Sequence, residues 1–377
     1  MKYGTLILHN GNELDPHTGA LSIPVYQAST YHQHDVDQPG RYEYSRSGNP
    51  TREALENTLA ALESGTSAFA FSSGMAATSS SLAILEQGDH VVATADIYGG
   101  SHRILSRFFT KFGITTTFVD MSRLENIEQA IKPNTRTLFL ESPSNPLLKV
   151  TDLVGAVALA RKHGLITMID NTFMSPYFQR PLEFGVDIVI HSATKFLGGH
   201  SDVIGGAVIT KSEHLASQIK FVQNGFGAIL GPQDCWLLLR GIKTLKVRME
   251  LQQQSAMEIA QWLKQQSWVT TVYYPGLPDH PGHDILKSQA TGFGAVLSFK
   301  TDTVERARQI MKQVKIWSVA VSLGGVESIL SYPVTMSHAA IPPADRERLG
   351  ITDNLIRLSV GLEEASDLIE DLAGALK

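Results

Sequence analysis

Between residues 67 and 190, short apolar segments alternate with stretches of helical character, and this alternation restricts the fold more than any other feature. The apolar segments read SAFAF, HVVAT, TLFLE, LITMID and VDIVI. They lack the regular polar alternation of a half-exposed strand, so both of their faces are expected to be buried. The pattern predicts an α/β fold in which helices cover a mainly parallel sheet. Functional residues are then expected at the carboxyl ends of the strands.

The length of 377 residues predicts two domains, preceded by an arm. Residues 1–50 are rich in Gly, Pro, His, Asn and Tyr and lack a long helical period, which predicts an extended arm that lies against another surface. Residues 51–245 are the expected large α/β domain, and Thr51 is expected to cap its first helix. Residues 246–377 are the expected small domain, with strands near GAVLSF and LIRLSV.

Charge and cysteine content limit the partners and the location of the chain. A formal net charge of −5 gives no broad cationic surface for nucleic acid or anionic lipid, so a small molecule is the expected partner. The sequence has no recognisable signal peptide or membrane span, and its only cysteine is Cys235. We therefore expect a cytoplasmic protein. The histidines of HQHD (32–35) and HPGH (280–283) lack a defined ligand set, so no metal is expected.

The segment VDIVIHSATKFLGGHSD, residues 186–202, carries the strongest chemical signal. An apolar strand ends there in small hydroxyl residues, followed by Lys195 and two glycines. A lysine at a strand end faces a pocket, where its amine can form an imine with an aldehyde such as that of pyridoxal phosphate. The hydroxyls of Ser192 and Thr194 are placed to bind a phosphate. Considered alone, Lys195 would more often be a solvated surface charge.

Asp170 supports the catalytic interpretation of Lys195. It ends the apolar segment LITMID, one strand unit before the lysine. A carboxylate in that place can pair with a protonated pyridine nitrogen. A helix-capping aspartate is the alternative, since such caps are common after strands.

A third segment, FAFSSGMAATSSSLAIL, combines a strand, a turn of small residues and a helix. Backbone amides at Ser73, Gly74 and Met75 would point toward a group above the helix N-terminus, where phosphate binds well. The turn is neither a P-loop nor a GxGxxG dinucleotide motif. By itself this signal is weak, because turns of this composition also occur without ligands.

Six motifs occur in order along the chain: YSRSGNPTR, SSGMAA, IYGG, ESPSNP, DNTF and HSATKFLGGHSD. Together they resemble those of the cystathionine γ-synthase and lyase family of pyridoxal-phosphate enzymes, over nearly the whole chain. The resemblance implies the fold type I architecture of aspartate aminotransferase, with a seven-stranded, mainly parallel sheet and a smaller C-terminal α/β domain.

By this resemblance the cofactor is pyridoxal 5′-phosphate and Lys195 is its Schiff-base partner. Asp170 is expected at the pyridine nitrogen, and Tyr98 is expected to stack on the ring and to take part in proton transfer. A half-buried strand-end aromatic residue is the ordinary alternative for Tyr98. The remaining residues expected to bind the cofactor are Ser73, Gly74, Met75, Thr172, Ser192 and Thr194.

The resemblance also implies a substrate site and a shared active site. Arg357, in LIRLSVG, resembles the arginine that binds the substrate α-carboxylate, with Asn145 and Ser322 as its helpers and Glu327 nearby; a solvent-facing strand arginine is the alternative. Two residues of the arm resemble ones that reach the phosphate of a neighbouring subunit. These are Tyr44 and Arg46, and they imply at least a homodimer, with a tetramer expected from the family.

The reaction expected first is that of a cystathionine β-lyase, which converts L-cystathionine to homocysteine, pyruvate and ammonia in methionine biosynthesis or transsulfuration. QNGFGAILGPQDCWLLLRGIKTL and YYPGLPDHPGH resemble bacterial β-lyases that are close in sequence to γ-lyases. Glu327, however, occupies a place where γ-acting members carry glutamate. Cystathionine γ-lyase is therefore the runner-up, and γ-replacement as in cystathionine γ-synthase or O-acetylhomoserine thiolyase comes third. Methionine γ-lyase ranks lower, because Gly100 stands where a reactive cysteine is usual.

Two hypotheses from other classes stay open at this point. A catalytically silent relative would serve as a binding protein, although the presence of Lys195 and Asp170 speaks against it. A dinucleotide-dependent dehydrogenase could use the same sheet architecture, although the GFG of residues 225–227 lacks the third glycine and the context of a nucleotide-binding motif. Both hypotheses are separated from the first by the cofactor that the purified protein carries.

Overall fold

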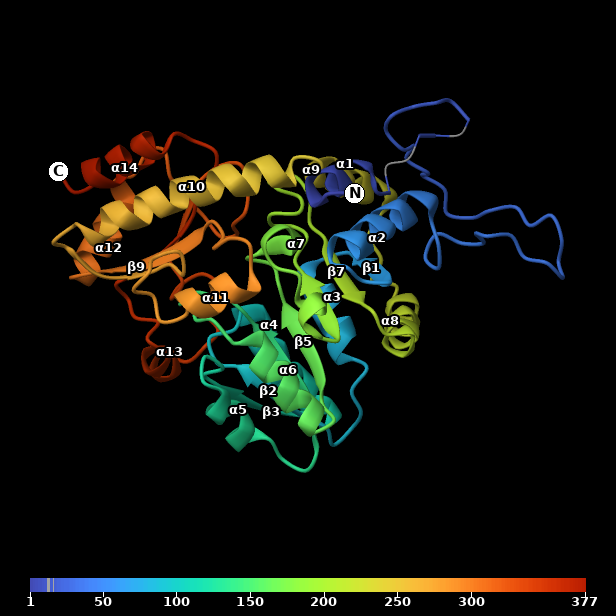
Figure 1. The fold of residues 1–377 in the computed structure, drawn as a ribbon, viewed down its shortest axis with the longest axis horizontal. Coiled ribbons are helices and arrows are strands. Elements are labelled where there is room, and N and C mark those ends of the chain that lie inside the picture. The colour runs from blue at the N-terminus through green and yellow to red at the C-terminus, as the bar shows by residue number, and fades with distance from the viewer. Residues whose placement is uncertain (12–13, 16) are drawn as a thin grey trace.

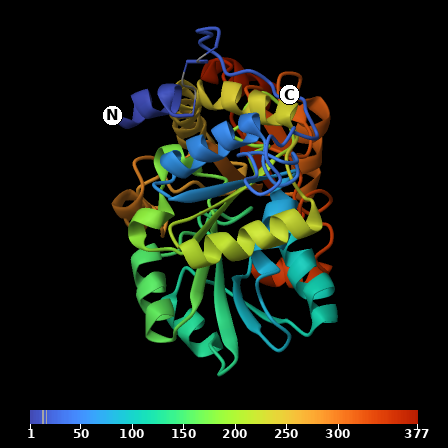
Figure 2. The same ribbon diagram turned by 90° about the vertical axis from the view of Figure 1, so that its right-hand side faces the viewer.

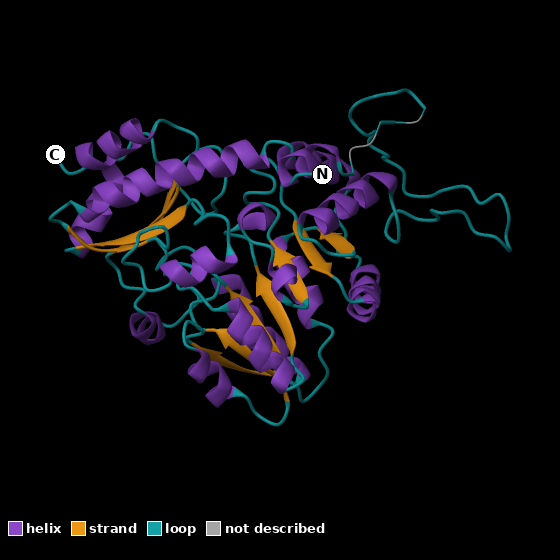
Figure 3. Cartoon of the chain, viewed as in Figure 1, coloured by secondary structure: helices purple, strands orange, loops and turns teal. Residues whose placement is uncertain are grey.

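The computed structural model describes residues 1–11, 14–15 and 17–377, and it contains two sheets (Figures 1 and 3). The larger sheet has seven strands in the order β1-β7-β6-β5-β4-β2-β3. Only β7 runs antiparallel to its neighbours, β1 and β6. The strands are β1 (Ser67–Phe71), β2 (His90–Thr94), β3 (Thr115–Val119), β4 (Thr135–Glu141), β5 (Ile166–Asp170), β6 (Ile188–His191) and β7 (Gly206–Thr210). The predicted α/β fold with a mainly parallel sheet is confirmed.

The central strands of this sheet are mostly apolar because helices cover both of their faces (Figure 2). In β4, Leu138 and Leu140 belong to one core cluster, whereas Phe139 between them belongs to the cluster on the other face. This is the alternation that the geometry of a strand imposes. The covering helices are α2 (Pro50–Leu62), α3 (Gly74–Leu82), α4 (Gly99–Arg103), the π-helix η1 (Ile104–Phe108), the 3-10 helix η2 (Phe109–Phe112), α5 (Leu124–Ala130), α6 (Leu153–Lys162), α7 (Ser175–Phe178), the 3-10 helix η3 (Pro181–Phe184), α8 (Glu213–Phe226) and α9 (Pro232–Ile242).

The cap of α2 differs from the prediction. Asn49, rather than Thr51, is the N-cap, and its side chain accepts hydrogen bonds from the amides of Thr51 and Arg52. Pro50 occupies the first helical position, where its missing N–H costs nothing. The helix therefore begins two residues earlier than expected.

The second sheet has five strands in the order β10-β11-β12-β9-β8. Helix α10 (Leu245–Lys264) leads to it and belongs to both parts of the molecule (Figure 1). Leu245 and Met249 lie in the core of the large sheet, whereas Ala256 and Leu263 lie in the core of the small one. The remaining elements are β8 (Val269–Tyr273), α11 (His283–Gln289), β9 (Val296–Thr301), α12 (Val304–Gln313), β10 (Ser318–Val319), β11 (Ile329–Ser331), α13 (Pro343–Leu349), β12 (Leu355–Ser359) and α14 (Ala365–Gly374).

The N-terminal arm is not extended over its whole length. Residues Tyr3–His9 form the short helix α1, which packs on the body of the molecule. The Tyr3 hydroxyl donates to the carbonyls of Leu62 and Pro176, and Ile7 is buried. Two anchoring contacts within a seven-residue segment give too weak a period to recognise in the sequence. Between residue 17 and α2, part of the arm projects away from the body (Figure 1).

Candidate active site

Lys195 lies four residues beyond the end of β6 and points toward the second sheet. Its ammonium nitrogen donates to Ser322 Oγ at 2.5 Å, across a separation of 127 residues. Burial lowers the pKa of Lys195 to about 8, helped by the positive charge of Arg357 and opposed by Asp170. A substantial fraction of this amine is therefore neutral near physiological pH, as a nucleophile or base requires.

Ser322 holds its hydroxyl under Lys195 by adopting an unusual backbone conformation. Its φ of 86° lies in the left-handed region, which costs a non-glycine residue about 1–3 kcal/mol. Arg357 Nη2 donates to the Ser322 carbonyl at 2.9 Å, and this bond helps to fix the turn. The strained residue thus joins Lys195 to Arg357.

Asp170 ends β5, beside β6, and its carboxylate is held from one side by Thr172. The Thr172 amide donates to Asp170 Oδ1 at 3.0 Å, and the Thr172 hydroxyl accepts from the Ser192 amide at 2.9 Å. Burial raises the pKa of Asp170, while the bonds from Thr172 and the charges of His191 and Lys195 oppose this shift. Because the carboxylate is desolvated, a cationic partner such as a protonated ring nitrogen would stabilise it.

The N-terminus of α3 packs very closely against the segment that leads to Lys195. A Cβ atom on Gly74 would lie 2.6 Å from Ser192 Cβ, so only glycine fits there. The Ser73 side chain caps the helix by accepting from the Ala76 amide at 3.0 Å. The first amides of a helix have no partner within it, so those of Gly74 and Met75 remain available for an anion beside the Ser192 hydroxyl.

Thr194 completes this cradle on the side of β7. Its hydroxyl accepts from the Gly205 amide at 3.0 Å and lies 3.2 Å from the Gly205 carbonyl oxygen. The cradle therefore combines helix amides with the hydroxyls of Ser192 and Thr194, next to a lysine of lowered pKa and a desolvated aspartate. This donor set fits pyridoxal phosphate, which needs a phosphate site, an amine and a partner for its ring nitrogen.

Tyr98 follows β2 and lies beside the same helix end. Its ring borders Gly100, where a Cβ atom would lie 2.5 Å from Tyr98 Cε1 and 2.7 Å from Met75 Sδ. Tyr98 is 41% exposed. Part of its side chain is thus accessible to a ligand bound at the α3 N-terminus.

Arg357 projects from β12 and is almost completely buried. Its Nη1 donates to Asn145 Oδ1 at 3.0 Å, and its Nη2 also donates to Ser331 Oγ at 3.2 Å. Its Nε has no acceptor among the described residues. Burial lowers the pKa of Arg357 to about 10, so the group stays cationic at neutral pH. An unpaired donor on a buried guanidinium is suited to a carboxylate ligand.

Three residues expected at the site lie apart from this group within one chain. Arg46 Nη1 donates to the Asn224 carbonyl at 2.7 Å, and its guanidinium lies 5.6 Å from the centre of the Tyr44 ring. Both arm residues are therefore packed near α8 rather than near Lys195. Glu327 is exposed and accepts from the Ser201 hydroxyl at 3.1 Å, beyond the loop that follows Lys195.

Sequence reasoning missed Glu141 and Arg248. Glu141 ends β4 opposite Asp170 and accepts from the Tyr98 amide at 2.9 Å; burial, Asp170 and Asp96 raise its pKa well above the usual range. Arg248, in α10, is buried and donates to the carbonyls of Phe196 at 2.7 Å and Gly241 at 2.8 Å. Glu141 was visible as the first residue of ESPSNP, whereas nothing in the sequence distinguishes Arg248.

The histidines set aside in the sequence analysis do not gather with other ligands. The rings of His32 and His34 are 4.9 Å apart, and His283 stacks on Phe293. Among the described residues there is no cluster of three or more His, Cys, Asp or Glu side chains that could hold a metal ion.

The fold and this site define a pyridoxal-phosphate-dependent enzyme with its lysine at the carboxyl end of a strand in a seven-stranded sheet. Residues 4–377 match the model of the Cys/Met metabolism PLP-dependent enzymes, and the chain belongs to this family. The resemblance found in the sequence is thereby confirmed.

Curated relatives and solved structures agree with this assignment over full length. The chain is 54% identical over 373 residues to cystathionine β-lyase MetC of Bacillus subtilis, covering 99% of this chain and 96% of that protein. It is 52% identical over 377 residues to cystathionine γ-lyase of the same organism, covering 100% of both. The structure of cystathionine γ-lyase from Lactobacillus plantarum complexed with L-serine has a TM-score of 0.98 at 46% identity, covering 100% of this chain and 98% of that one.

Proposed function

We propose that the chain is a cystathionine β-lyase, which cleaves L-cystathionine to homocysteine, pyruvate and ammonia. The observation that carries this proposal is the arrangement of Lys195, whose amine has a lowered pKa and lies between Asp170 and the Ser322–Arg357 pair. The β-lyase names of relatives such as MetC of Bacillus subtilis support the choice of reaction.

Each residue contributes a separate step. Arg357, supported by Asn145, binds the substrate carboxylate and so fixes the α-carbon. Lys195 in its neutral form takes the α-proton, and Asp170 would hold the cofactor's ring nitrogen in its protonated form. Pyridoxal phosphate supplies an electron sink for the α-carbon when it is bound. Tyr98 would cover the ring, and the Ser73–Met75 turn with Ser192 and Thr194 would hold its phosphate.

The competing reaction is γ-elimination, which gives cysteine, 2-oxobutyrate and ammonia. One sequence observation favours it: Glu327 occupies the place where γ-acting members carry glutamate, although within one chain its carboxylate accepts from Ser201 and lies apart from Lys195. The γ-lyase name of the relative that is 52% identical supports the same alternative. γ-Replacement ranks third.

Incubation of the loaded protein with L-cystathionine, followed by identification of the thiol and the keto acid, tests the reaction. Homocysteine with pyruvate supports the β-lyase, whereas cysteine with 2-oxobutyrate replaces it with the γ-lyase. Lys195→Ala is the control, since it should lose both the yellow colour and the turnover. A colourless wild-type protein would instead favour the silent binding protein.

We further propose that two chains share their active sites. Within one chain Arg46 and Tyr44 are packed near α8, apart from Lys195, where the partner's cofactor phosphate would receive them. Large exposed side chains border Met75 and Gly100, with Phe108 at 49% and Phe226 at 66% exposure. A second copy of the chain would cover them. We expect these dimers to pair into a tetramer in the cytoplasm. Separately, no helix in the described ranges has the length and apolarity of a membrane span.

Mixing two inactive variants tests the shared site. In a mixed dimer of Arg46→Ala and Lys195→Ala, one site has both residues intact. Random re-association should therefore restore about a quarter of the wild-type turnover. If the mixture stays as inactive as its components after subunit exchange, Arg46 does not act across subunits. Light scattering after gel filtration measures the dimer or tetramer independently.

A further inference from the structure

A cleft that none of the expected active-site residues line lies between the large sheet and the small one. Its volume is about 740 Å³, within the range of about 300–1,000 Å³ that is usual for small-molecule sites, which also tend to form between domains. One wall comes from the large-sheet side, through Arg123, Leu147 and Lys149. The other comes from β8 and the loop that follows it, including Tyr273 and Asp279.

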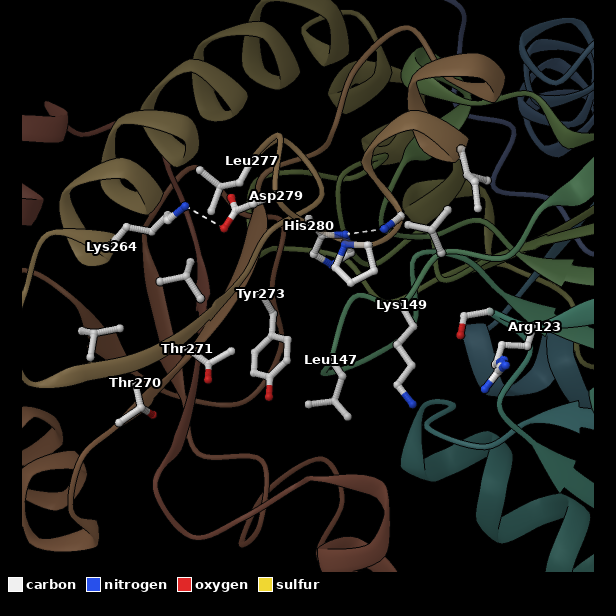
Figure 4. A pocket seen from close by; sticks show the side chains of 17 residues that line it. Arg123, Leu147, Lys149, Lys264, Thr270, Thr271, Tyr273, Leu277, Asp279 and His280 are labelled. Carbon is white, nitrogen blue, oxygen red and sulfur yellow. Dashed lines mark hydrogen bonds and ion pairs between the residues drawn. The ribbon is translucent and has the colours of Figure 1, made fainter.

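The lining combines an apolar floor with an excess of positive charge (Figure 4). Leu147, Val150, Val272, Leu277 and Ile285 provide the apolar surface. Three cations but only one carboxylate line the cleft, and Lys264 already pairs with that carboxylate, Asp279, at 2.7 Å. In Figure 4, Tyr273 and Leu147 lie between this pair and Lys149 with Arg123.

Two donors in the cleft are free to take an anion. The Arg123 guanidinium makes no hydrogen bond or ion pair within the described ranges, and neither does the Tyr273 hydroxyl. Lys149 Nζ pairs with Asp120 at 2.6 Å but is a third exposed and has further donors. A short apolar chain that ends in a carboxylate would match both the floor and these donors.

The cleft is joined to the substrate site through one hydrogen-bonded turn. The Ser144 amide donates to the Lys149 carbonyl at 2.9 Å, and the Lys149 amide donates to Ser144 Oγ at 3.0 Å. Asn145, which accepts from Arg357, belongs to the same turn. A ligand that shifts Lys149 therefore acts on the turn that positions Arg357.

We propose that this cleft is an effector site for a small amphipathic carboxylate, held by Arg123 and Lys149, that changes substrate affinity through the 144–149 turn. The effect on affinity rests on the proposed lyase function, whereas binding itself does not. A competing carboxylate at Arg357 is the main confounder, because hexanoate could bind there too.

Hexanoate is a suitable probe, followed by saturation-transfer NMR on the pyridoxal-phosphate-loaded protein. Arg123→Gln should weaken the saturable signal about threefold, as expected for one exposed charge contact. Thr271→Trp should abolish it by filling the cleft, while Arg348→Gln, an exposed arginine elsewhere, should leave it unchanged. Circular dichroism and gel filtration verify that each variant is folded.

The kinetic arm compares the KM for cystathionine with and without hexanoate. Wild type should show a changed KM, and Thr271→Trp should not. Binding that persists unchanged in both cleft variants places hexanoate outside the cleft and overturns the proposal. Binding in the cleft that leaves KM unchanged overturns it as well. If cystathionine is not a substrate at all, the lyase proposal fails, yet the NMR result still decides whether the cleft binds a carboxylate.

Discussion

The role of Glu141 can be separated into its charge and its hydrogen bond by two substitutions. The carboxyl is buried opposite Asp170, and burial, Asp170 and Asp96 raise its pKa well above the usual range, which favours the protonated acid. Glutamine has the shape of that acid and keeps an oxygen for the Tyr98 amide, which lies 2.9 Å from Glu141 Oε2. Glu141→Gln should therefore stay within about threefold of the wild-type kcat/KM.

Glu141→Ala should behave differently because it leaves the Tyr98 amide without an acceptor. An unsatisfied buried donor costs about 1–3 kcal/mol. If Tyr98 loses its position by that free energy, kcat/KM falls about 5- to 150-fold. Steady-state kinetics of cystathionine cleavage, with thermal unfolding of each variant, measure both effects, and Glu128→Gln is a surface control. Equal damage by glutamine and alanine would refute the reasoning, since the ionised carboxylate would then be the form that acts.

Two further predictions concern the cofactor site, and a third concerns the stability of the fold. The apo-protein should take up pyridoxal phosphate, followed by absorbance, at a rate that rises with pH and levels off above about 8. The reason is that burial lowers the pKa of Lys195 to about 8 and only the neutral amine reacts. A rate that does not depend on pH between 7 and 9 would contradict this. Gly74→Ala should weaken cofactor affinity about tenfold or more by equilibrium dialysis, since the new Cβ would lie 2.6 Å from Ser192 Cβ; unchanged affinity would exclude a phosphate cradle there. Arg248→Met should lower the free energy of unfolding by about 1–3 kcal/mol, because it orphans the buried carbonyl of Phe196, whereas the Gly241 carbonyl still accepts from Thr244. An unchanged free energy of unfolding in urea would contradict this.

The sequence was sufficient for the strands that are buried on both faces, since their apolar residues form uninterrupted runs. It was insufficient for β3, an edge strand of mixed Thr and apolar residues whose first residue, Thr115, is exposed. It also missed β7, because GAVIT follows a glycine-rich segment and reverses direction in the sheet. Edge position and reversed direction are tertiary properties that a local pattern does not contain.

The residues of the candidate site could likewise be predicted only in part from the sequence. Asp170, Ser192 and Lys195 follow strands, so their approach could be expected from the topology of a parallel sheet. The contact of Lys195 with Ser322 joins residues 127 positions apart, and it was not predicted, because the family resemblance placed Ser322 only beside Arg357. Arg248 could not be foreseen, because an arginine in a long amphipathic helix is ordinarily solvated.

Helix α10 also bears on how the protein comes apart. Its first half packs into the core of the large sheet and its second half into the core of the small one. Loss of either core would expose one half of the helix and withdraw support from the other. Heating or a denaturant should thus dismantle both sheets in one cooperative transition, and a protease should find no intact small sheet to release.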